Sequence, residues 1–404
     1  MKSSIGIDSR SVVDAAVDAL VRIALRAPSE RECDAVNLAL ADALACMAAS
    51  LDRDLTSGHV HQVEDLVIAA AALDLDDIDW TTMHHPGSVV IPAALALARE
   101  AGCTGEDLRR AIAAGYRVAS AVGSMLDPGF RARWHATAIC GAFGAAASAA
   151  LLQGAGEAVL ERTFLLVACS VGGLAIAPRA RNGAAVFTRV AAASLGKLAA
   201  SGSYRELQVA PGAISGPGGL AEVLSDQPLR QLEDRGGAEA ASLRLFPVTG
   251  FAHAAVWTAQ TFSGSLSSVK SVDVSLAQAS MNMNAQSPWW DIGHAVGQVL
   301  VGKNAFTCDG DRPIPLAVRL EGSNLPITQA EIVLEDWEGS LEHLTGDVPG
   351  RLNDQESPAL FLRKAEEVLH VSGEQAILHA SHQLTDGVAR NEEFKNILLA
   401  IISH

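Results

Sequence analysis

Aromatic residues are scarce in this chain of 404 residues. Phe, Trp and Tyr make up 4% of it, while Ala and Gly are abundant. Small side chains let helices approach closely, whereas β-sheets draw on aromatic and β-branched residues. The composition therefore argues against a sheet sandwich and favours closely packed helices. Because 49% of the residues are hydrophobic and 19% are charged, the chain can fill a large core, which argues against disorder.

Several signatures of function are also missing. No GxGxxG, P-loop, HExxH or GxSxG pattern stands where it could act. The six cysteines are scattered without a CxxC pair or a Cys/His cluster, which predicts reduced, mostly buried thiols in a cytoplasmic protein. The first twenty residues lack the apolar core of a signal peptide. The uncharged stretch 135–156 is rich in Ala, Gly and Ser, and so predicts a central helix of a soluble protein, not a membrane span.

Positive charge is in short supply. The chain has 30 Lys and Arg against 46 Asp and Glu, a formal net charge of −16. Such a surface repels nucleic acid and anionic membranes. We therefore expect no nucleic-acid or membrane partner. If the substrate is itself anionic, cations must be concentrated in its site.

Helical spacing of apolar residues dominates the first 260 residues. Ser29 with Glu32 predicts a capping box, and Thr104 with Asp107 predicts another helix start. The predicted helices span 8–26, 33–50, 88–102, 108–126, 136–152, 157–175, 184–201 and 247–262.

The pattern changes near residue 265, where Val alternates with polar residues as in a strand. Further strands are predicted at 315–322 and 328–336, with helices at 291–302 and 357–370. The sequence thus predicts a mainly α protein. A large all-helical domain would span 1–264, with a C-terminal helix at 391–404 docking back on it, and a smaller α+β domain would span 265–390.

One polar stretch, LDLDDIDWTTMHHPG at 73–87, lies between two apolar runs. Asp74, Asp76 and Asp77 could chelate a hard cation, but no calcium-loop pattern of Gly or Asn accompanies them. One of them could cap the next helix. Neither role explains His84 and His85. A histidine paired with a carboxylate in a buried cleft is a general acid/base arrangement.

Other basic side chains stand near predicted helix starts. His135 begins a helix of small residues and follows Arg131 and Arg133. A helix N-terminus favours anions, although a histidine bonded to a backbone carbonyl is the ordinary alternative. Arg181 precedes the helix predicted at 184 and is either a solvated cation or part of an anion clamp. His253, inside an apolar helix, is by itself typical of a core histidine.

Together these stretches resemble the MmgE/PrpD family, which includes 2-methylcitrate dehydratase, cis-aconitate decarboxylase and iminodisuccinate epimerase. The matching segments are LDLDD, HHPGSVVIPAALALARE, WHATAICGAFGAAASAALLQG and FPVTGFAHAA. Their order and spacing match the family across about residues 10 to 300.

The resemblance implies a large helical domain, a smaller α+β lid domain and a cleft between them. It also implies a homodimer that acts on a small carboxylate without a metal or organic cofactor. The family's acid/base positions fall on Asp74, His85, His135 and His253, and we expect Asp74 to orient His85. We expect four further residues to contact the substrate: His84, Ser88, Arg181 and Trp290.

The chain departs from the family at two positions. It has no Lys between residues 3 and 196, where the family has one before the helix predicted at 184. Arg181 is the nearest cation there, but arginine stays protonated and cannot act as a base. Gly293 stands near the position of a family Tyr, with Trp289 and Trp290 just upstream.

Dehydration, decarboxylation and epimerisation share this layout and stay open. The missing Lys and Tyr favour proton transfer between two histidines over dehydration. One alternative is a repurposed member that acts on a bulkier substrate of specialised metabolism, with the tryptophans lining an apolar subsite. Another is a non-catalytic dimeric binding or scaffold protein, against which the retained histidines argue.

Overall fold

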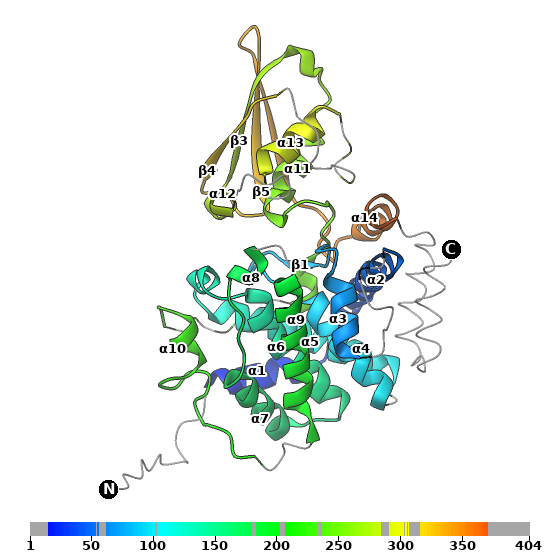
Figure 1. Cartoon of the computed structure of the whole chain (residues 1–404), viewed down its shortest axis with the longest axis vertical. Helices are drawn as coiled ribbons and strands as arrows, with labels where there is room; N and C mark the ends of the chain where they lie inside the picture. The colour runs from blue at the N-terminus through cyan, green and yellow to red at the C-terminus, as the bar shows by residue number, and fades with distance from the viewer. Residues whose placement is uncertain are drawn as a thin grey trace. The chain divides into compact units, whose positions relative to one another are not determined.

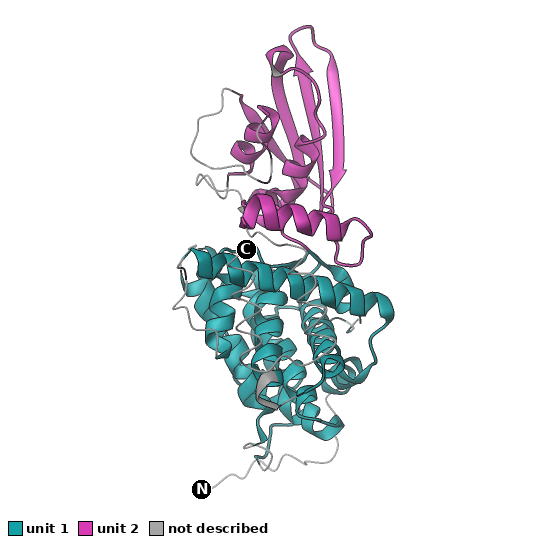
Figure 2. Ribbon diagram, turned by 90° about the vertical axis from the view of Figure 1, so that its right-hand side faces the viewer, with its two compact units in different colours: residues 1–242, 373–404 teal, residues 243–372 magenta. Residues whose placement is uncertain are grey.

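The computed structural model divides into two compact units. Unit 1 comprises residues 1–242 and 373–404, and unit 2 comprises 243–372 (Figure 2). The division predicted near residue 264 therefore differs, since the segment 243–264 belongs to unit 2. The described residues are 15–370 without 54, 56–61, 102, 180–182, 203–206, 229, 231, 233, 235, 284–290, 303, 305 and 307–315. The helix predicted at 391–404 lies outside them.

Unit 1 is built mainly from helices, as predicted (Figure 1). One short strand pair adds to them: β1 (Ile78–Asp79) runs antiparallel to β2 (Ala241–Ser242). The helices are α1 (Ala15–Leu25), α2 (Glu30–Asp52), α3 (Val63–Ala71), α4 (Gly87–Ala101), α5 (Gly105–Met125), α6 (Ala136–Leu152), α7 (Glu157–Ala168), α8 (Ile176–Arg179), α9 (Gly183–Ala200) and α10 (Leu220–Leu224), with short 3-10 turns at η1 (Pro128–Ala132) and η3 (Gly237–Ala240).

Helix α6 is the centre of unit 1, where it packs against α4, α5, α7 and α9. Its side chains are buried almost without exception. Small residues make the close packing possible: a Cβ added to Gly144 would lie 2.6 Å from the carbonyl oxygen of Gly115 on α5. The expected central helix of small residues is confirmed.

Helix α2 is the one described helix that is long and apolar enough to cross a membrane. Within unit 1, however, 89% of its apolar window is buried by other parts of the protein. Burial of this kind is usual for a core helix of a globular domain.

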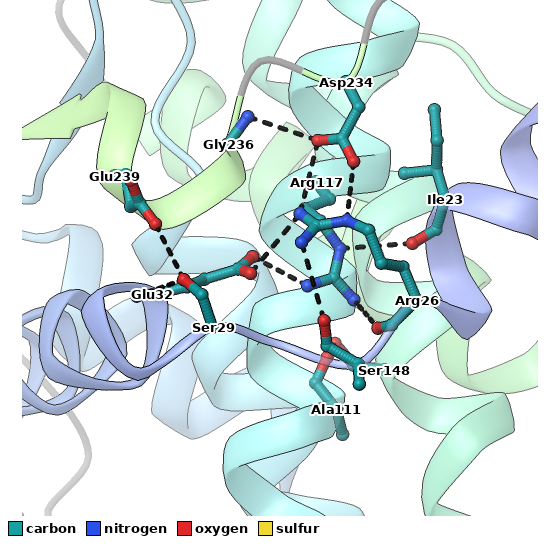
Figure 3. Close-up of polar contacts among 11 residues, drawn as sticks. Ile23, Arg26, Ser29, Glu32, Ala111, Arg117, Ser148, Asp234, Gly236 and Glu239 are labelled. Atoms are coloured by element: carbon teal, nitrogen blue, oxygen red, sulfur yellow. Dashed lines mark hydrogen bonds and ion pairs between the residues drawn. The ribbon is translucent and has the colours of Figure 1, made fainter.

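The start of α2 is fixed by a buried ion network (Figure 3). The Ser29 hydroxyl accepts the backbone N–H of Glu32, as predicted. The Glu32 carboxylate is bonded differently from a capping box, because it accepts from the Arg117 guanidinium at 2.7 Å. Arg117 also donates to the carbonyls of Ile23 and Arg26, so this α5 side chain ties down the connection between α1 and α2.

The helix start predicted from Thr104 and Asp107 is confirmed. Thr104 caps α5 by accepting the backbone N–H of Asp107, and the Asp107 carboxylate accepts the backbone N–H of Thr104. The five described cysteines form no disulfide with one another. Cys46 and Cys140 are buried as expected, but Cys169 is exposed because it ends α7 at the surface.

Unit 2 contains a four-stranded sheet in the order β4-β3-β5-β6. Strand β3 pairs in parallel with β4 and antiparallel with β5, which pairs antiparallel with β6. The strands are β3 (Val269–Ala277), β4 (Val318–Ser323), β5 (Gln329–Asp336) and β6 (Leu341–Asp347); the helices are α11 (His253–Ala259), α12 (Gln278–Met283), α13 (Ile292–Leu300) and α14 (Ser357–Lys364), which continues as a π-helical turn over Ala365–Leu369.

One face of this sheet forms the core of unit 2. Val274 on β3 is buried opposite Ile332 on β5, and alternate residues of both strands follow the same pattern. Helix α11 packs on β5 and β6, while α13 packs on β4 (Figure 1). The strands β3, β4 and β5 were predicted. β6 was not, because its side chains are mostly exposed and show no apolar alternation.

Candidate functional site

The acidic stretch forms the loop between α3 and α4, with β1 in its middle. Asp76, Asp77 and Asp79 are buried, whereas the side chain of Asp74 is 38% exposed. Asp74 has a φ of 52°, a left-handed conformation that few residues other than glycine adopt and that aspartate tolerates. This turn separates Asp74 from the buried carboxylates that follow it.

Two of these carboxylates bind one buried guanidinium. Arg189 on α9 donates through Nη1 to both oxygens of Asp76, at 3.0 and 3.1 Å. Its Nη2 donates to Oδ1 of Asp74 at 3.2 Å. The two carboxylates raise the pKa of Arg189 against its burial, so the cation is retained in the interior. The pairing ties the loop to α9.

The Asp77 carboxylate is bound at two points. Its Oδ2 accepts from the Tyr116 hydroxyl at 2.7 Å, and its Oδ1 accepts the backbone N–H of Gly87 at 2.8 Å. This confirms that one aspartate caps the next helix, because Gly87 begins α4. Burial raises the pKa of Asp77 to about 7, against the opposing effect of the Tyr116 hydrogen bond.

Gly87 is required by this arrangement. A Cβ at that position would lie 2.5 Å from Oδ1 of Asp77 and 2.9 Å from the Tyr116 hydroxyl. Glycine in the HHPG segment therefore lets the carboxylate and the phenol meet at the start of α4.

His85 is oriented by the same loop. Its Nδ1 lies 2.8 Å from the backbone carbonyl of Asp77 and 3.8 Å from Oδ2 of Asp76. A carbonyl only accepts hydrogen bonds, so Nδ1 carries the proton and Nε2 is the basic nitrogen. The carboxylate that faces Nδ1 of His85 is thus that of Asp76, whereas we expected Asp74 to orient this histidine.

His135 is the N-cap residue of α6 and is also held through Nδ1, which lies 2.7 Å from the Thr188 hydroxyl of α9. Thr188 gives its own proton to the carbonyl of Ala185. It must therefore accept from His135, and Nε2 is again the basic nitrogen. Burial, followed by the charges of Arg189 and His85, lowers the pKa of His135 to about 3, while Asp74 opposes the shift.

His84 and Ser88 belong to the interior of unit 1. His84 is fully buried, and its Nδ1 forms a hydrogen bond with the Thr82 hydroxyl. Burial lowers the pKa of His84 to about 4. The fully buried Ser88 hydroxyl donates to the carbonyl of His85. These contacts favour a supporting role over direct contact with a substrate.

The remaining sequence candidates lie elsewhere. His253 begins α11 in unit 2, where it is fully buried, and its Nε2 lies 3.2 Å from the carbonyl of Phe246. Burial and then the charge of Arg244 lower its pKa. Arg181 and Trp290 lie outside the described residues. Unit 1 therefore brings together Asp74, His85 and His135 of the predicted acid/base set.

No group of three or more His, Cys, Asp and Glu among the described residues is arranged to hold a metal ion. The possibility that the three aspartates chelate a cation finds no support in their contacts, because Asp74 and Asp76 bind Arg189 and Asp77 binds Tyr116.

Sequence reasoning missed Arg189 and Tyr116. A signal for Arg189 was present, since it is the arginine in the otherwise apolar segment AAVFTRVAAA. A guanidinium that is buried with such a helix face needs carboxylate partners. Tyr116 carried a weaker signal, as a phenol on an alanine-rich helix needs a hydrogen-bond partner once it is buried.

No protein of curated function matches this chain significantly in sequence. Residues 66–232 match the MmgE/PrpD N-terminal domain. That range contains the acidic loop, both histidines of the cluster and the α9 residues that hold them. Members of this family are generally dehydratase-type lyases or related enzymes. The match supports the resemblance: residues 66–232 of this chain are similar to the N-terminal domain of the MmgE/PrpD family.

Proposed function

We propose that the protein is a lyase or isomerase that moves a proton at a carbon beside a carboxylate group of a small substrate. The observation that carries this proposal is that His85 and His135 lie near each other, since the backbone N–H of His85 donates to the hydroxyl of Thr137, two residues after His135. Each imidazole is held through Nδ1, which leaves Nε2 as its basic nitrogen. Their charges also interact, since His85 contributes to the lowered pKa of His135.

The two histidines differ in how readily they are protonated, which suits one to take a proton and the other to give one. His85 has the Asp76 carboxylate 3.8 Å from Nδ1, so the imidazolium formed when it takes a proton is stabilised. His135 has no such partner at Nδ1 and stays neutral at physiological pH. A substrate carboxylate close to His135 would raise its pKa, because an opposite charge favours the protonated imidazole. The substrate would thus prepare His135 to donate or return a proton.

Dehydration, decarboxylation and epimerisation all fit this scheme. In a dehydration, one histidine removes the carbon-bound proton and the other protonates the departing hydroxide. In an epimerisation, the second histidine returns a proton to the opposite face. Under the proposal Asp74 and His253 take part in acid/base chemistry, and Arg181 and Trp290 contact the substrate. We further expect a cytoplasmic homodimer whose own side chains perform the chemistry.

The experiment is an NMR screen of the full-length protein in D2O with aconitate, methylcitrate, iminodisuccinate and related acids. Deuterium in a C–H bond without net reaction identifies an epimerase, and an alkene or CO2 identifies a lyase. The matched control is the His85→Gln/His135→Gln double variant, which must be folded and inactive. No change in any acid of the panel would contradict the small-carboxylate proposal and favour a bulkier substrate.

A further inference from the structure

Two consecutive residues of α9 hold the two histidines. One bonds directly to His135, and the other bonds to the carboxylate beside His85. Thr188 binds Nδ1 of His135, and Arg189 binds Asp76, whose carboxylate lies behind His85. The two side chains reach the cluster from a helix more than 45 residues further along the chain than either histidine. We infer that Thr188 and Arg189 are positioning residues that together set the tautomer of His135 and the electrostatics of the pair.

Thr188 determines which nitrogen of His135 is basic. Its hydroxyl proton is used in the 2.9 Å bond to the carbonyl of Ala185, so its oxygen can only accept from Nδ1–H. A valine has the same shape but cannot accept. The Nδ1–H would then be buried without a partner, which is energetically costly. Moving the proton to Nε2 relieves that cost, but Nδ1 then becomes the basic nitrogen and Nε2 can no longer accept a proton.

Arg189 sets the net charge around the two histidines. Its Nη1 bridges both oxygens of Asp76, which fixes the plane of the carboxylate nearest to His85. Its Nη2 holds Asp74 at 3.2 Å. Without the guanidinium, the two carboxylates would lose its positive charge beside the imidazoles. Negative charge stabilises imidazolium, so His135 would titrate at higher pH.

The charged neighbours of the two imidazoles come from α9, from the loop between α3 and α4, and from the start of α6. His135 meets Arg189 from α9 and both His85 and Asp74 from the loop between α3 and α4. His85 meets Asp76 within its own loop, together with His84 and His135. Arg189 is the cation that lowers the pKa of His135, and its removal is therefore the most direct test.

The experiment is long-range ¹H–¹⁵N NMR on the full-length protein labelled at its 12 histidines, with signals assigned from His85→Gln and His135→Gln variants. We expect Nδ1–H tautomers for both residues in the wild type. Thr188→Val should shift His135 toward the Nε2–H tautomer and leave His85 unchanged, while Thr188→Ser should keep the wild-type tautomer. An unchanged His135 in Thr188→Val overturns the role of Thr188.

Arg189→Met should raise the titration midpoint of His135 by a pH unit or more, and Arg189→Lys should keep it close to the wild-type value. If Arg189→Met does not fold, the Arg189→Met/Asp74→Asn variant also removes the negative charge of Asp74, and the midpoint should still rise because the larger effect on His135 is that of Arg189. An unchanged midpoint in the folded variant overturns the role of Arg189.

The consequence for turnover rests on the proposed function, but the NMR readout needs no substrate. Shifted histidines in a protein that turns over no acid would contradict the proposed function and leave the positioning intact. Turnover together with unshifted histidines would contradict the positioning alone.

Discussion

The Tyr116 hydroxyl donates to the Asp77 carboxylate across 2.7 Å in the interior of unit 1, where both side chains are buried. The same aspartate caps α4 through its other oxygen and holds Nδ1 of His85 through its backbone carbonyl. One residue thus joins a helix start, a helix side chain and a candidate catalytic imidazole. The geometry of His85 depends on this pair.

Asp77→Asn should change how stability depends on pH. The carboxyl has a pKa of about 7 when folded and an ordinary value near 3.8, so the native state holds its proton more tightly. The contribution of the Asp77 carboxyl to the free energy of unfolding is fully present below pH 4 and is lost as the pH rises through about 7. One pKa unit corresponds to about 1.4 kcal/mol, which gives a loss on the order of 4 kcal/mol.

Urea unfolding of the wild type and Asp77→Asn between pH 4 and 8 measures this effect. His84 and His135, whose pKa values are lowered to about 4 and about 3, act in the opposite direction over the acidic part of the range. They are present in both proteins, so the difference between the two curves isolates Asp77. The variant should gain stability relative to the wild type as pH rises. A constant difference would show that Asp77 does not titrate in this range.

Gly87→Ala should destabilise the protein and impair activity. The new methyl group would stand 2.5 Å from Oδ1 of Asp77 and force apart the cap and the tyrosine pair. Overpacking of this kind costs about 1–3 kcal/mol. Gly183→Ala, where a Cβ would meet no atom within 4 Å, is the matched control and should change stability by under ~1 kcal/mol. Equal unfolding midpoints for the two variants would contradict the packing argument.

Arg117→Met should be among the most damaging changes in unit 1. It leaves the Glu32 carboxylate buried without the guanidinium 2.7 Å away (Figure 3), which costs about 3–5 kcal/mol. Arg133 is the control, since its ion pair with Asp226 is exposed, and Arg133→Met should cost under ~1 kcal/mol. The Arg117→Met/Glu32→Met double variant should recover part of the loss. A double variant as unstable as the sum of its parts would rule out charge burial as the cause.

The sequence predicted the helices of unit 1 well because their signals are local. α6 begins and ends at the predicted residues, 136 and 152, and Thr104 and Asp107 mark the start of α5. The same local pattern misled at Glu32, whose carboxylate turns to Arg117, a residue 85 positions away. Local spacing gives no information on such a partner.

The cluster was predictable in part for the same reason. The family motifs located Asp74, His85 and His135, but the pairing of Arg189 with Asp76 spans 113 residues. The family positions therefore suggested Asp74 as the partner of His85, whereas the carboxylate 3.8 Å from its Nδ1 is that of Asp76. The strand β6 was missed because a mostly exposed strand lacks apolar alternation.

His84→Gln should mainly lower stability, whereas His85→Gln should mainly lower activity, although the two residues are neighbours. His84 is fully buried and bonded to Thr82, so its replacement should lower stability and change kcat/KM by less than about tenfold. His85 has a partly exposed ring with a basic Nε2, so its replacement should reduce kcat/KM by about 100-fold or more. The reverse order would transfer the proposed catalytic role to His84.

The central claim is that His85 and His135 both move protons in one reaction. The most direct measurement is the rate at which solvent deuterium enters the substrate with the wild type and with His85→Gln and His135→Gln, at equal and verified folding. The account predicts that each single variant loses about 100-fold or more, with a melting temperature close to that of the wild type. A folded single variant that exchanges deuterium at more than about a tenth of the wild-type rate would contradict it.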